Sequence, residues 1–422
     1  MRHFFSNVSR LLQGSIAGQL IAFAALPILA RLYNSHDLGI AQAVLSILNI
    51  LIIVSALRLE VAILYVPSEK LENLMRCGWW LCVFTSSIAL IVTSIITLIR
   101  IDWSDAHRVA ALLLPLVGLF SGWNLLLGYF ALRLKAFSAS SNVKIVQSLA
   151  YSSSAASLGY WRPSSVSLLL AEIFSRFSSN YFIVRSLRLE QKYFKWPGFK
   201  ILKTVLKSHR ELVSLGLGGA LVNTAGSAFT SVMLLGLFNA SEAGQYAMLE
   251  RFIGMPVGLI AATVSQVFMA QLSSAVSTNN HEESLNTFRK LLKIQTIAGL
   301  AIVLVLLFLA PQLIVFVLGE SWQRSSEMLQ PLSLLYFFSF IVGPINMTLT
   351  IIYRQRLQLM WDCTRFILVN STWFGVWYFS ININSALWLY ALSASISYLI
   401  YIIITNQALR TFVRAPQNGE LC

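Results

Sequence analysis

Long apolar segments separated by short polar turns run through the whole chain. Residues 14–30 and 297–319, for example, contain no charged side chain. A helix needs about 20 apolar residues to cross a bilayer, whereas the strands of a membrane barrel alternate apolar and polar residues, and that alternation is absent. The pattern therefore predicts an all-α polytopic membrane protein. Its twelve predicted spans lie near residues 12–30, 39–64, 77–99, 109–130, 143–158, 164–184, 211–235, 244–270, 292–317, 328–350, 364–380 and 385–405.

One polar turn occurs twice. The segment LYNSHDLG, residues 32–39, is echoed by LFNASEAG, residues 237–244. In each copy an Asn, which turns the chain readily, precedes an acid at the start of the next helix, where the helix dipole favours negative charge. The copies lie between spans 1 and 2 and between spans 7 and 8. They predict two six-helix halves with the same orientation, as in the parallel repeats of transporters, whose substrate path lies between the halves.

A long basic stretch interrupts the short loops in the middle of the chain. It divides the chain into a predicted N-terminal six-helix half (1–184), a linker (185–210), a C-terminal six-helix half (211–405) and a tail (406–422). Lys and Arg gather on the cytoplasmic side of membrane proteins, and 23 of the 31 basic residues fall on the side of the linker and both termini. We therefore expect both termini, the linker and the tail to be cytoplasmic.

Composition narrows the function further. The chain of 422 residues is 57% hydrophobic and 11% charged, far from the composition of a soluble domain. Its net charge of +14 would suit nucleic acid, but the basic residues sit at helix ends, where anionic lipid head groups lie. Membrane lipids are therefore expected partners, and nucleic acid is not.

Motifs for catalysis or cofactors are absent from the sequence. The four cysteines and five histidines show no zinc-site spacing, and the segment GLGLGG lacks the Lys-Ser/Thr of a phosphate-binding loop. No nucleophile and base stand together in a recognisable pattern. We expect neither a catalytic residue nor a metal nor a cofactor, and hence a protein that is not an enzyme.

Charged residues within spans cost about 2.5–3.5 kcal/mol each on insertion scales and persist when they are paired or face water. Glu172 and Arg176 in span 6 are four residues apart, so they share a helix face and can pair. Such a pair either packs the bundle as a neutralised unit or faces a cavity.

The other two pairs have different spacings. Arg58 and Glu60 near the cytoplasmic end of span 2 are two apart, so on a continuous helix they point to different sides and either snorkel to head groups or line a cavity. Glu250 and Arg251 in span 8 are adjacent, cannot face the same way, and need other partners. Spans 2 and 8 are equivalent in the repeat, so their charges could meet in a water-filled cavity that suits an anionic diphosphate.

Small and polar residues mark spans 1 and 7. Gly14 and Gly18 give span 1 a small-xxx-small face, and Gly219 matches Gly14 in span 7. Such faces usually permit close helix packing. Polar residues nearby could instead face the cavity and bind sugar hydroxyls; these are Gln13, Gln19, Asn223 and Thr224.

Residues 26–65 resemble the start of Wzx-type polysaccharide repeat-unit flippases of the multidrug/oligosaccharidyl-lipid/polysaccharide (MOP) exporter superfamily. The segment GQYAMLERF, residues 244–252, is similar to its counterpart in that family, and twelve spans and chain length agree throughout. The features that carry the likeness are LARLY, the acid and glycine Asp37 and Gly39, and Arg58, Glu60 and Ala62 closing span 2.

The resemblance implies a flippase of the bacterial inner membrane. Such proteins move an undecaprenyl-diphosphate-linked oligosaccharide, the repeat unit of O-antigen or exopolysaccharide, from the cytoplasmic to the periplasmic leaflet. They use alternating access through a cationic central cavity. The resemblance leaves undecided whether transport is coupled to a proton or sodium gradient. A polysaccharide polymerase and a chain-length regulator are the implied protein partners. On this chain the cationic candidates are Arg58, Arg176 and Arg251, and the pairing or proton-coupling candidates are Glu60, Glu172 and Glu250.

Two alternatives stay open at this point. One is a small-molecule or multidrug antiporter of the same superfamily. The other is a membrane enzyme such as a polysaccharide polymerase or ligase, although such enzymes need a long outer loop and the predicted outer loops are short. The sugar, the coupling ion and the oligomeric state are not encoded in any pattern that we recognise.

Overall fold

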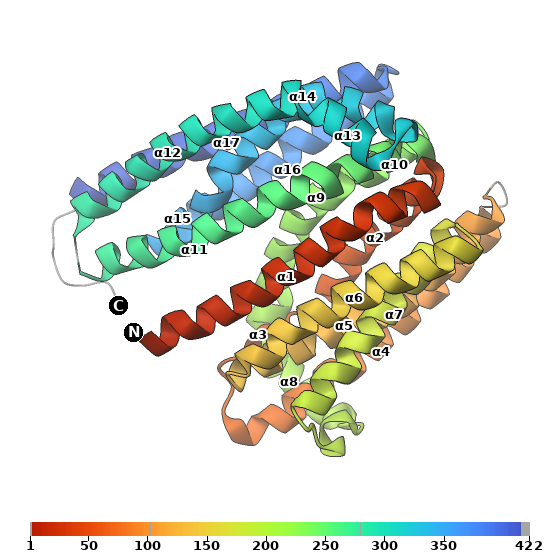
Figure 1. Cartoon of the computed structure of the whole chain (residues 1–422). Helices are drawn as coiled ribbons and strands as arrows, with labels where there is room; N and C mark the ends of the chain where they lie inside the picture. Colours follow the sequence, from red (N-terminus) through yellow and green to blue (C-terminus); the bar gives the residue numbers. More distant parts are fainter. Residues whose placement is uncertain (1, 101–102, 279, 415–422) are drawn as a thin grey trace. The chain divides into compact units, whose positions relative to one another are not determined.

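The computed structural model describes residues 2–100, 103–278 and 280–414 (Figure 1). Every regular element within these ranges is helical, which confirms the predicted all-α class. Contacts between residues divide the chain into two compact units, Met1–Met248 and Leu249–Cys422, here called unit 1 and unit 2. This division lies beyond the predicted linker, because α9 packs against α2. The organisation into six plus six spans stays a prediction.

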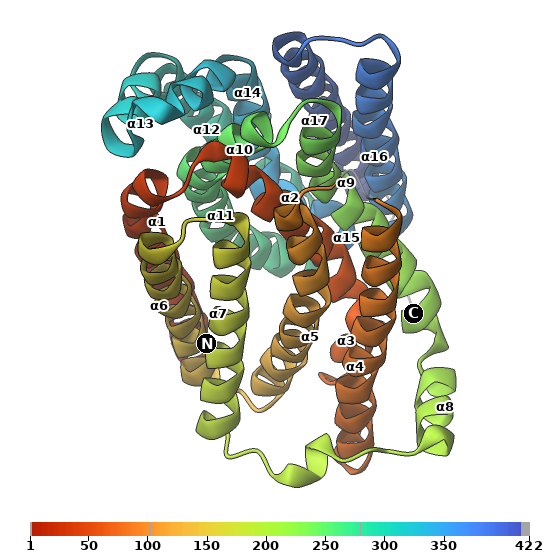
Figure 2. The same cartoon turned by 90° about the vertical axis from the view of Figure 1, so that its right-hand side faces the viewer.

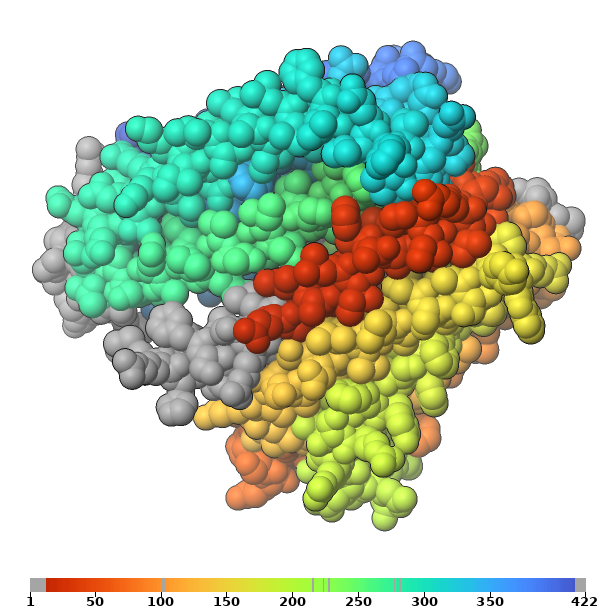
Figure 3. Space-filling view, in the orientation of Figure 1, coloured from red at the N-terminus to blue at the C-terminus, as the bar shows by residue number. Residues whose placement is uncertain are grey.

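Unit 1 is built around α5 and α6. Helix α5 packs against α2, α4 and α7, and α6 lies between α1 and α7. Figures 1 and 2 show these helices running side by side, and Figure 3 shows α1 lying along α6 at the surface. The elements are α1 (Arg2–Leu32), α2 (Ser35–Ser55), α3 (Leu59–Ala62), α4 (Ser68–Ile99), α5 (Asp105–Arg133), α6 (Phe137–Trp161), α7 (Ser165–Ser186), η1 (Gln191–Phe194), α8 (Phe199–Ser208), η2 (Leu212–Gly216), α9 (Leu217–Leu237) and α10 (Ala240–Leu249).

Unit 2 continues the chain from the end of α10. Helix α17 packs against α14 and α16, and α14 packs against α12 and α13. Helix α11 lies against α12 and against the short η5 and α15. The elements are η3 (Glu250–Gly254), α11 (Met255–Ser277), α12 (His281–Phe308), α13 (Ala310–Leu318), η4 (Glu320–Trp322), α14 (Gln323–Val342), η5 (Gly343–Ile345), α15 (Thr348–Ile351), α16 (Gln355–Tyr378) and α17 (Ile383–Arg414).

The helices make this a multi-pass membrane protein. Each of the twelve predicted spans falls on a long helix or on a run of consecutive helices. Among the described residues, eight helices are long and apolar enough to cross a membrane, or nine if the bent pair Leu212–Gly226 and Ala228–Leu237 counts as one span. Helices α6, α7 and α16 are not among them. Large apolar side chains on α4 such as Leu98, which is 77% exposed, suit contact with lipid.

The repeated turn forms the same cap twice. The Asn34 side chain accepts a hydrogen bond from the amide of Asp37 at 2.8 Å, and the Asn239 side chain accepts one from the amide of Glu242 at 2.9 Å. Side chains of this kind satisfy an amide that the first turn of a helix leaves unpaired. The predicted local role of the two asparagines is therefore confirmed.

The two copies of the turn also pack against each other within unit 1. A Cβ atom on Gly39 would collide with the carbonyl of Ala240, and one on Gly244 would collide with the carbonyl of Ser35. The hydroxyls of Ser35 and Ser241 hydrogen-bond at 2.6 Å. Both glycines are therefore needed for the close approach of α2 and α10. The repeat places equivalent residues on both sides of one contact.

Candidate functional site

The helix of the second predicted span ends earlier than the sequence suggests. Helix α2 ends at Ser55, and Leu57 and Arg58 then adopt left-handed backbone angles, with φ of 50° and 66°. Such angles cost a residue with a Cβ atom roughly 1–2 kcal/mol. The one-turn helix α3 follows directly. The span predicted over residues 39–64 is therefore broken near its end.

This turn brings Arg58 and Glu60 together. The Nη1 atom of Arg58 lies 3.5 Å from Oε1 of Glu60, so the two form an ion pair. The expectation that they point to different sides is wrong, because it assumed a continuous helix. The guanidinium Nε is buried and donates no hydrogen bond, whereas the Arg58 side chain as a whole is 30% exposed. Arg58 thus has one weakly held partner and access to the outside of the unit.

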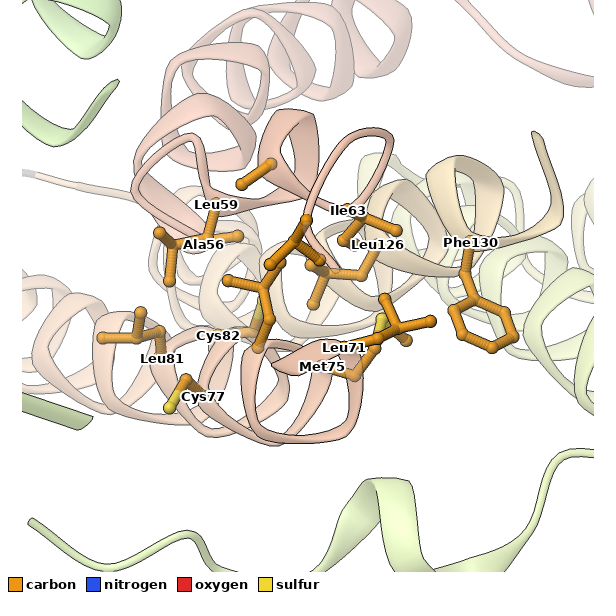
Figure 4. Packing of buried hydrophobic residues seen from close by; sticks show 13 residues of the cluster. Ala56, Leu59, Ile63, Leu71, Met75, Cys77, Leu81, Cys82, Leu126 and Phe130 are labelled. Atoms are coloured by element: carbon orange, nitrogen blue, oxygen red, sulfur yellow. The ribbon is translucent and has the colours of Figure 1, made fainter. Parts of the chain in front are cut away.

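Glu60 is an unusually isolated acid. It is 1% exposed, and neither carboxylate oxygen makes a hydrogen bond to another described residue. Its neighbours Leu59 and Ile63 belong to an apolar cluster with side chains of α4 and α5, among them Leu81, Cys82 and Leu126 (Figure 4). A carboxylate in such surroundings loses its hydration without replacement.

The broken helix is held in place by Arg133 of α5, which donates to the carbonyl of Ile63 at 2.6 Å and to the Ser68 hydroxyl at 3.4 Å. The scaffold of the pair is therefore fixed, while the contact within the pair is loose.

The second ion pair of unit 1, between Glu172 and Arg176, is closed by a short hydrogen bond. Nε of Arg176 donates to Oε1 of Glu172 at 2.6 Å on the same face of α7, which confirms the pairing predicted from the spacing. The side chains are 23% and 12% exposed. The next turn is also bonded, since Ser175 donates to the carbonyl of Gln147 on α6 at 2.7 Å and Asn180 donates to that of Phe120 on α5 at 2.8 Å. The pair therefore lies on a helix that Ser175 and Asn180 bind to α6 and α5.

One basic residue near this pair was not among the predicted candidates. Lys144 of α6 is exposed at its side chain and lies close enough to Arg176 for the two positive charges to interact. The sequence placed Lys144 at the cytoplasmic end of a span and treated it as a marker of orientation. Its position three residues before Gln147, on the polar helix α6, is the signal that could have revealed it.

In unit 2 the adjacent pair Glu250 and Arg251 opens the π-helical segment η3. The hydroxyl of Tyr336 on α14 donates to Oε1 of Glu250 at 2.7 Å, and Tyr336 is 4% exposed. Gly254 makes room for the same carboxylate, because a Cβ there would lie 2.7 Å from Oε2. The expectation that Glu250 needs a partner other than its neighbour is confirmed. Arg251 is half-buried, and π-helical turns often mark functional sites.

The predicted small and polar residues have mixed outcomes. Gly14 packs against Ser141, and a Cβ on Gly18 would lie 2.9 Å from the carbonyl oxygen of Lys144, so the close packing of span 1 is confirmed. The matching role of Gly219 is wrong for the described part of the chain, where no neighbouring helix lies within 4 Å of its Cβ position. The proposed sugar contacts stay predictions: Gln13 and Gln19 are exposed, Thr224 is half-buried, and the side chain of Asn223 lies outside the described residues.

No group of three or more His, Cys, Asp or Glu side chains in the described part of the chain could hold a metal ion. The charged features of the two units are instead arginines with acidic partners or neighbours. Such groups suit an anionic ligand, because guanidinium binds phosphate oxygens with two parallel hydrogen bonds.

Comparisons with known proteins extend this picture. A family model described as "Polysaccharide biosynthesis protein" matches residues 28–327, and no curated protein sequence matches the chain. Among solved structures the chain is similar to the lipid II flippase MurJ in an inward closed conformation, with a TM-score of 0.72 and 14% identity over 95% of this chain and 90% of that one.

Two further solved structures belong to the MOP superfamily by their descriptions. One is an inward-facing multidrug resistance MATE family transporter, with a TM-score of 0.59 and 12% identity over 96% of each chain. The other is a transporter from Pyrococcus furiosus described as having a binding pocket of reverse polarity, with a TM-score of 0.55 and 12% identity over 96% of this chain and 95% of that one. The chain therefore has the fold of these transporters.

Proposed function

Because the chain belongs to the family of polysaccharide biosynthesis proteins, we propose that it is a flippase for an undecaprenyl-diphosphate-linked oligosaccharide repeat unit. It moves this lipid from the cytoplasmic to the periplasmic leaflet of a bacterial inner membrane, for the synthesis of a surface polysaccharide. The observation that carries the proposal is the family match over residues 28–327 on a chain with a transporter fold.

The arginines supply the chemistry that the substrate needs. A diphosphate presents several anionic oxygens. The Arg58 side chain is 30% exposed, and its ion pair with Glu60, at 3.5 Å, is its one ion pair among the described residues. Arg58 can therefore exchange this contact for two charge-assisted hydrogen bonds to phosphate. We assign Arg58 of unit 1 as a diphosphate ligand, and Arg176, which is matched by Glu172, as a cavity residue. The half-buried Arg251 is the cationic candidate within unit 2.

The rest of the scheme follows from the charge distribution and the repeat. The protein works by alternating access, with both termini and the basic linker in the cytoplasm. Gln13, Gln19, Asn223 and Thr224 contact sugar hydroxyls. Glu250, bound by Tyr336, is the candidate in unit 2 for coupling to a proton or sodium gradient. A polymerase and a chain-length regulator receive the product in the outer leaflet.

A multidrug antiporter is the second candidate, favoured by the likeness to the MATE family transporter. The description of the Pyrococcus furiosus protein indicates that pocket polarity differs among proteins of this fold. We therefore infer the charge of the ligand from this chain, in which the side chains of Arg58 and Arg176 are 30% and 23% exposed. A cationic drug would be repelled by those groups.

Translocation by the purified full-length protein tests the proposal. Proteoliposomes would carry fluorescent undecaprenyl-diphosphate-linked oligosaccharides extracted from the strain that bears the gene, and an impermeant quencher would report the outer-leaflet fraction. We expect rapid transfer by the wild type and slow transfer by the Arg58→Ala, Arg176→Ala, Arg251→Ala triple variant. Equal rates with protein and with empty liposomes, together with drug resistance in cells that express the gene, would favour the antiporter instead.

A further inference from the structure

We propose that Arg365 of unit 2 binds the phosphate group of a membrane lipid. Helix α16 carries Arg365 in its first half, and α17 packs beside this helix (Figure 2). The phosphate belongs either to the diphosphate of a lipid-linked substrate or to an anionic phospholipid. Arg365 lies outside the charged pairs described above, and its role does not depend on which molecule the protein transports.

Two aromatic rings hold the guanidinium of Arg365 in place. Its Cζ atom lies 5.7 Å from the ring centroid of Trp361, one turn earlier on α16, and 5.2 Å from that of Tyr398 on α17. Both distances are within the range of cation–π attraction, which draws a guanidinium to the face of a ring. A ring face takes up no N–H group, so these contacts position the side chain and leave its five donors available.

The rings themselves are fixed by the core of unit 2. Trp361 and Tyr398 are both buried, and Trp361 donates its indole N–H to the carbonyl of Ser397 at 2.8 Å. Trp361 also packs against Tyr401, with 4.5 Å between the ring centroids, and Tyr401 donates to the carbonyl of Asn346 at 2.7 Å. A guanidinium that is positioned in this way loses little side-chain freedom when a ligand binds, which favours affinity.

The N–H groups of Arg365 are not used within the protein. In the part of the chain that the structure describes, the guanidinium makes neither a hydrogen bond nor an ion pair. The charge of Asp362, three residues earlier, interacts with it from a distance without forming an ion pair there. The side chain is half-buried, and its nitrogens are not enclosed, in contrast to Nε of Arg58. A partly desolvated cation with open donors is stabilised by an anionic oxygen.

The depth of Arg365 in the membrane favours a lipid phosphate as the anion. Under the predicted orientation, α16 enters the membrane from the cytoplasmic side, and Arg365 stands at the start of the span predicted over residues 364–380. Anionic lipid head groups lie at that level. Arg354 and Arg356 are exposed at the beginning of the same helix. The segment therefore carries three positive charges against the one negative charge of Asp362, and a guanidinium can bind two phosphate oxygens at once.

Calorimetry on the full-length protein in maltoside micelles tests the proposal with two probes, farnesyl diphosphate and dioctanoyl phosphatidylglycerol. The parent protein carries Arg58→Ala, so that only binding outside the site assigned to Arg58 is measured. In this parent, Arg365→Gln should weaken the binding of at least one probe by about tenfold or more, because charge-assisted hydrogen bonds are lost. A loss for farnesyl diphosphate alone identifies the substrate diphosphate as the ligand. A loss for phosphatidylglycerol alone identifies the phospholipid.

Further variants separate the site from a general effect of charge. Arg356→Gln removes an exposed arginine from the start of the same helix and should change the affinity for either probe by less than about threefold. Arg365→Lys keeps the charge but loses the planar fork, so its affinity should lie between those of the parent and Arg365→Gln. Tyr398→Leu removes one ring and should weaken binding by several-fold, whereas Tyr398→Phe keeps the ring and should match the parent.

Three results would overturn the assignment of Arg365. They are unchanged affinity for both probes in Arg365→Gln, no binding of either probe by the parent, and an equal loss in Arg365→Gln and Arg356→Gln, which would mean that only net charge matters. Thermal unfolding in micelles verifies that each variant is folded before its affinity is compared. None of these results bears on the flippase proposal, which the translocation assay tests separately.

Discussion

The two arginine–glutamate pairs of unit 1 consist of the same residue types but differ in geometry. Glu172 and Arg176 lie one turn apart on an unbroken helix and share a hydrogen bond of 2.6 Å. Arg58 and Glu60 meet across a left-handed turn, at 3.5 Å, without a hydrogen bond. The first pair is closed by its own hydrogen bond, on a helix that Ser175 and Asn180 bind to α6 and α5. The second pair is held in contact by strained backbone and leaves both charges poorly satisfied.

The difference indicates that backbone geometry decides whether an ion pair stabilises the helix bundle or is available for ligand binding. A buried pair with a good hydrogen bond is costly to break by removal of one partner, although replacement of the whole pair is often close to neutral. The arginine of a pair that lacks hydrogen bonds can leave its carboxylate and bind a phosphate instead, because no hydrogen bond is lost in the exchange. Strained non-glycine residues often gather where such an exchange is part of the mechanism. We therefore expect variants of the two pairs to separate stability from ligand binding.

The largest effect is expected on stability, from Arg176→Ala. Removal of the guanidinium leaves Glu172 buried without its partner, which should lower the free energy of unfolding by about 3–5 kcal/mol. Denaturant titration of the protein in micelles measures this change. Arg58→Ala is the matched control and should lose clearly less, because its contact with Glu60 at 3.5 Å includes no hydrogen bond that the substitution could break. An equal loss in both variants would contradict the distinction.

The next effect is expected on ligand affinity, from Arg58→Ala. Loss of charge-assisted hydrogen bonds to a phosphate should weaken the binding of farnesyl diphosphate by about 1.5–3 kcal/mol, or roughly 10- to 100-fold. Arg58→Lys should fall in between, since an ammonium keeps the charge and loses the bidentate geometry. Calorimetry in nanodiscs gives both values. Wild-type affinity in Arg58→Ala would show that the exposed guanidinium is not a phosphate ligand.

The smallest effect is expected from the double variant Glu172→Gln, Arg176→Gln. The two amides can still hydrogen-bond on the same helix face, and neither leaves a buried charge behind. Replacement of a whole buried pair is often close to neutral, so we expect a change in unfolding free energy of about 1 kcal/mol or less. Diphosphate affinity should stay within about twofold of the wild type. A large loss of affinity would make Arg176 a direct ligand.

The sequence could predict what depends on neighbours along the chain. The pairing of Glu172 with Arg176 follows from their spacing on a helix, and the caps at Asn34 and Asn239 follow from the repeated turn. The reciprocal packing of Gly39 and Gly244 is a contact between distant residues, and the repeat indicated only that their positions are equivalent.

Two features of the site could not be predicted from the sequence, because they depend on tertiary geometry. Neither Leu57 nor Arg58 is a residue that favours left-handed angles, so nothing in LRLE signals the break that brings Arg58 to Glu60. The partner of Glu250 is Tyr336, on another helix and far along the chain. A buried tyrosine in an apolar span is ordinary by pattern alone. In both cases tertiary packing, and not local preference, sets the site.

The central claim is that the loose pair serves transport and the locked pair serves the scaffold. The most direct test is the initial rate of translocation of the extracted lipid-linked oligosaccharide in proteoliposomes, for three proteins at equal folded amounts. We predict a wild-type rate for Glu172→Gln, Arg176→Gln and a rate lower by about tenfold or more for Arg58→Ala. Equal rates in Arg58→Ala and the wild type, or an equal loss in both variants, would contradict the claim.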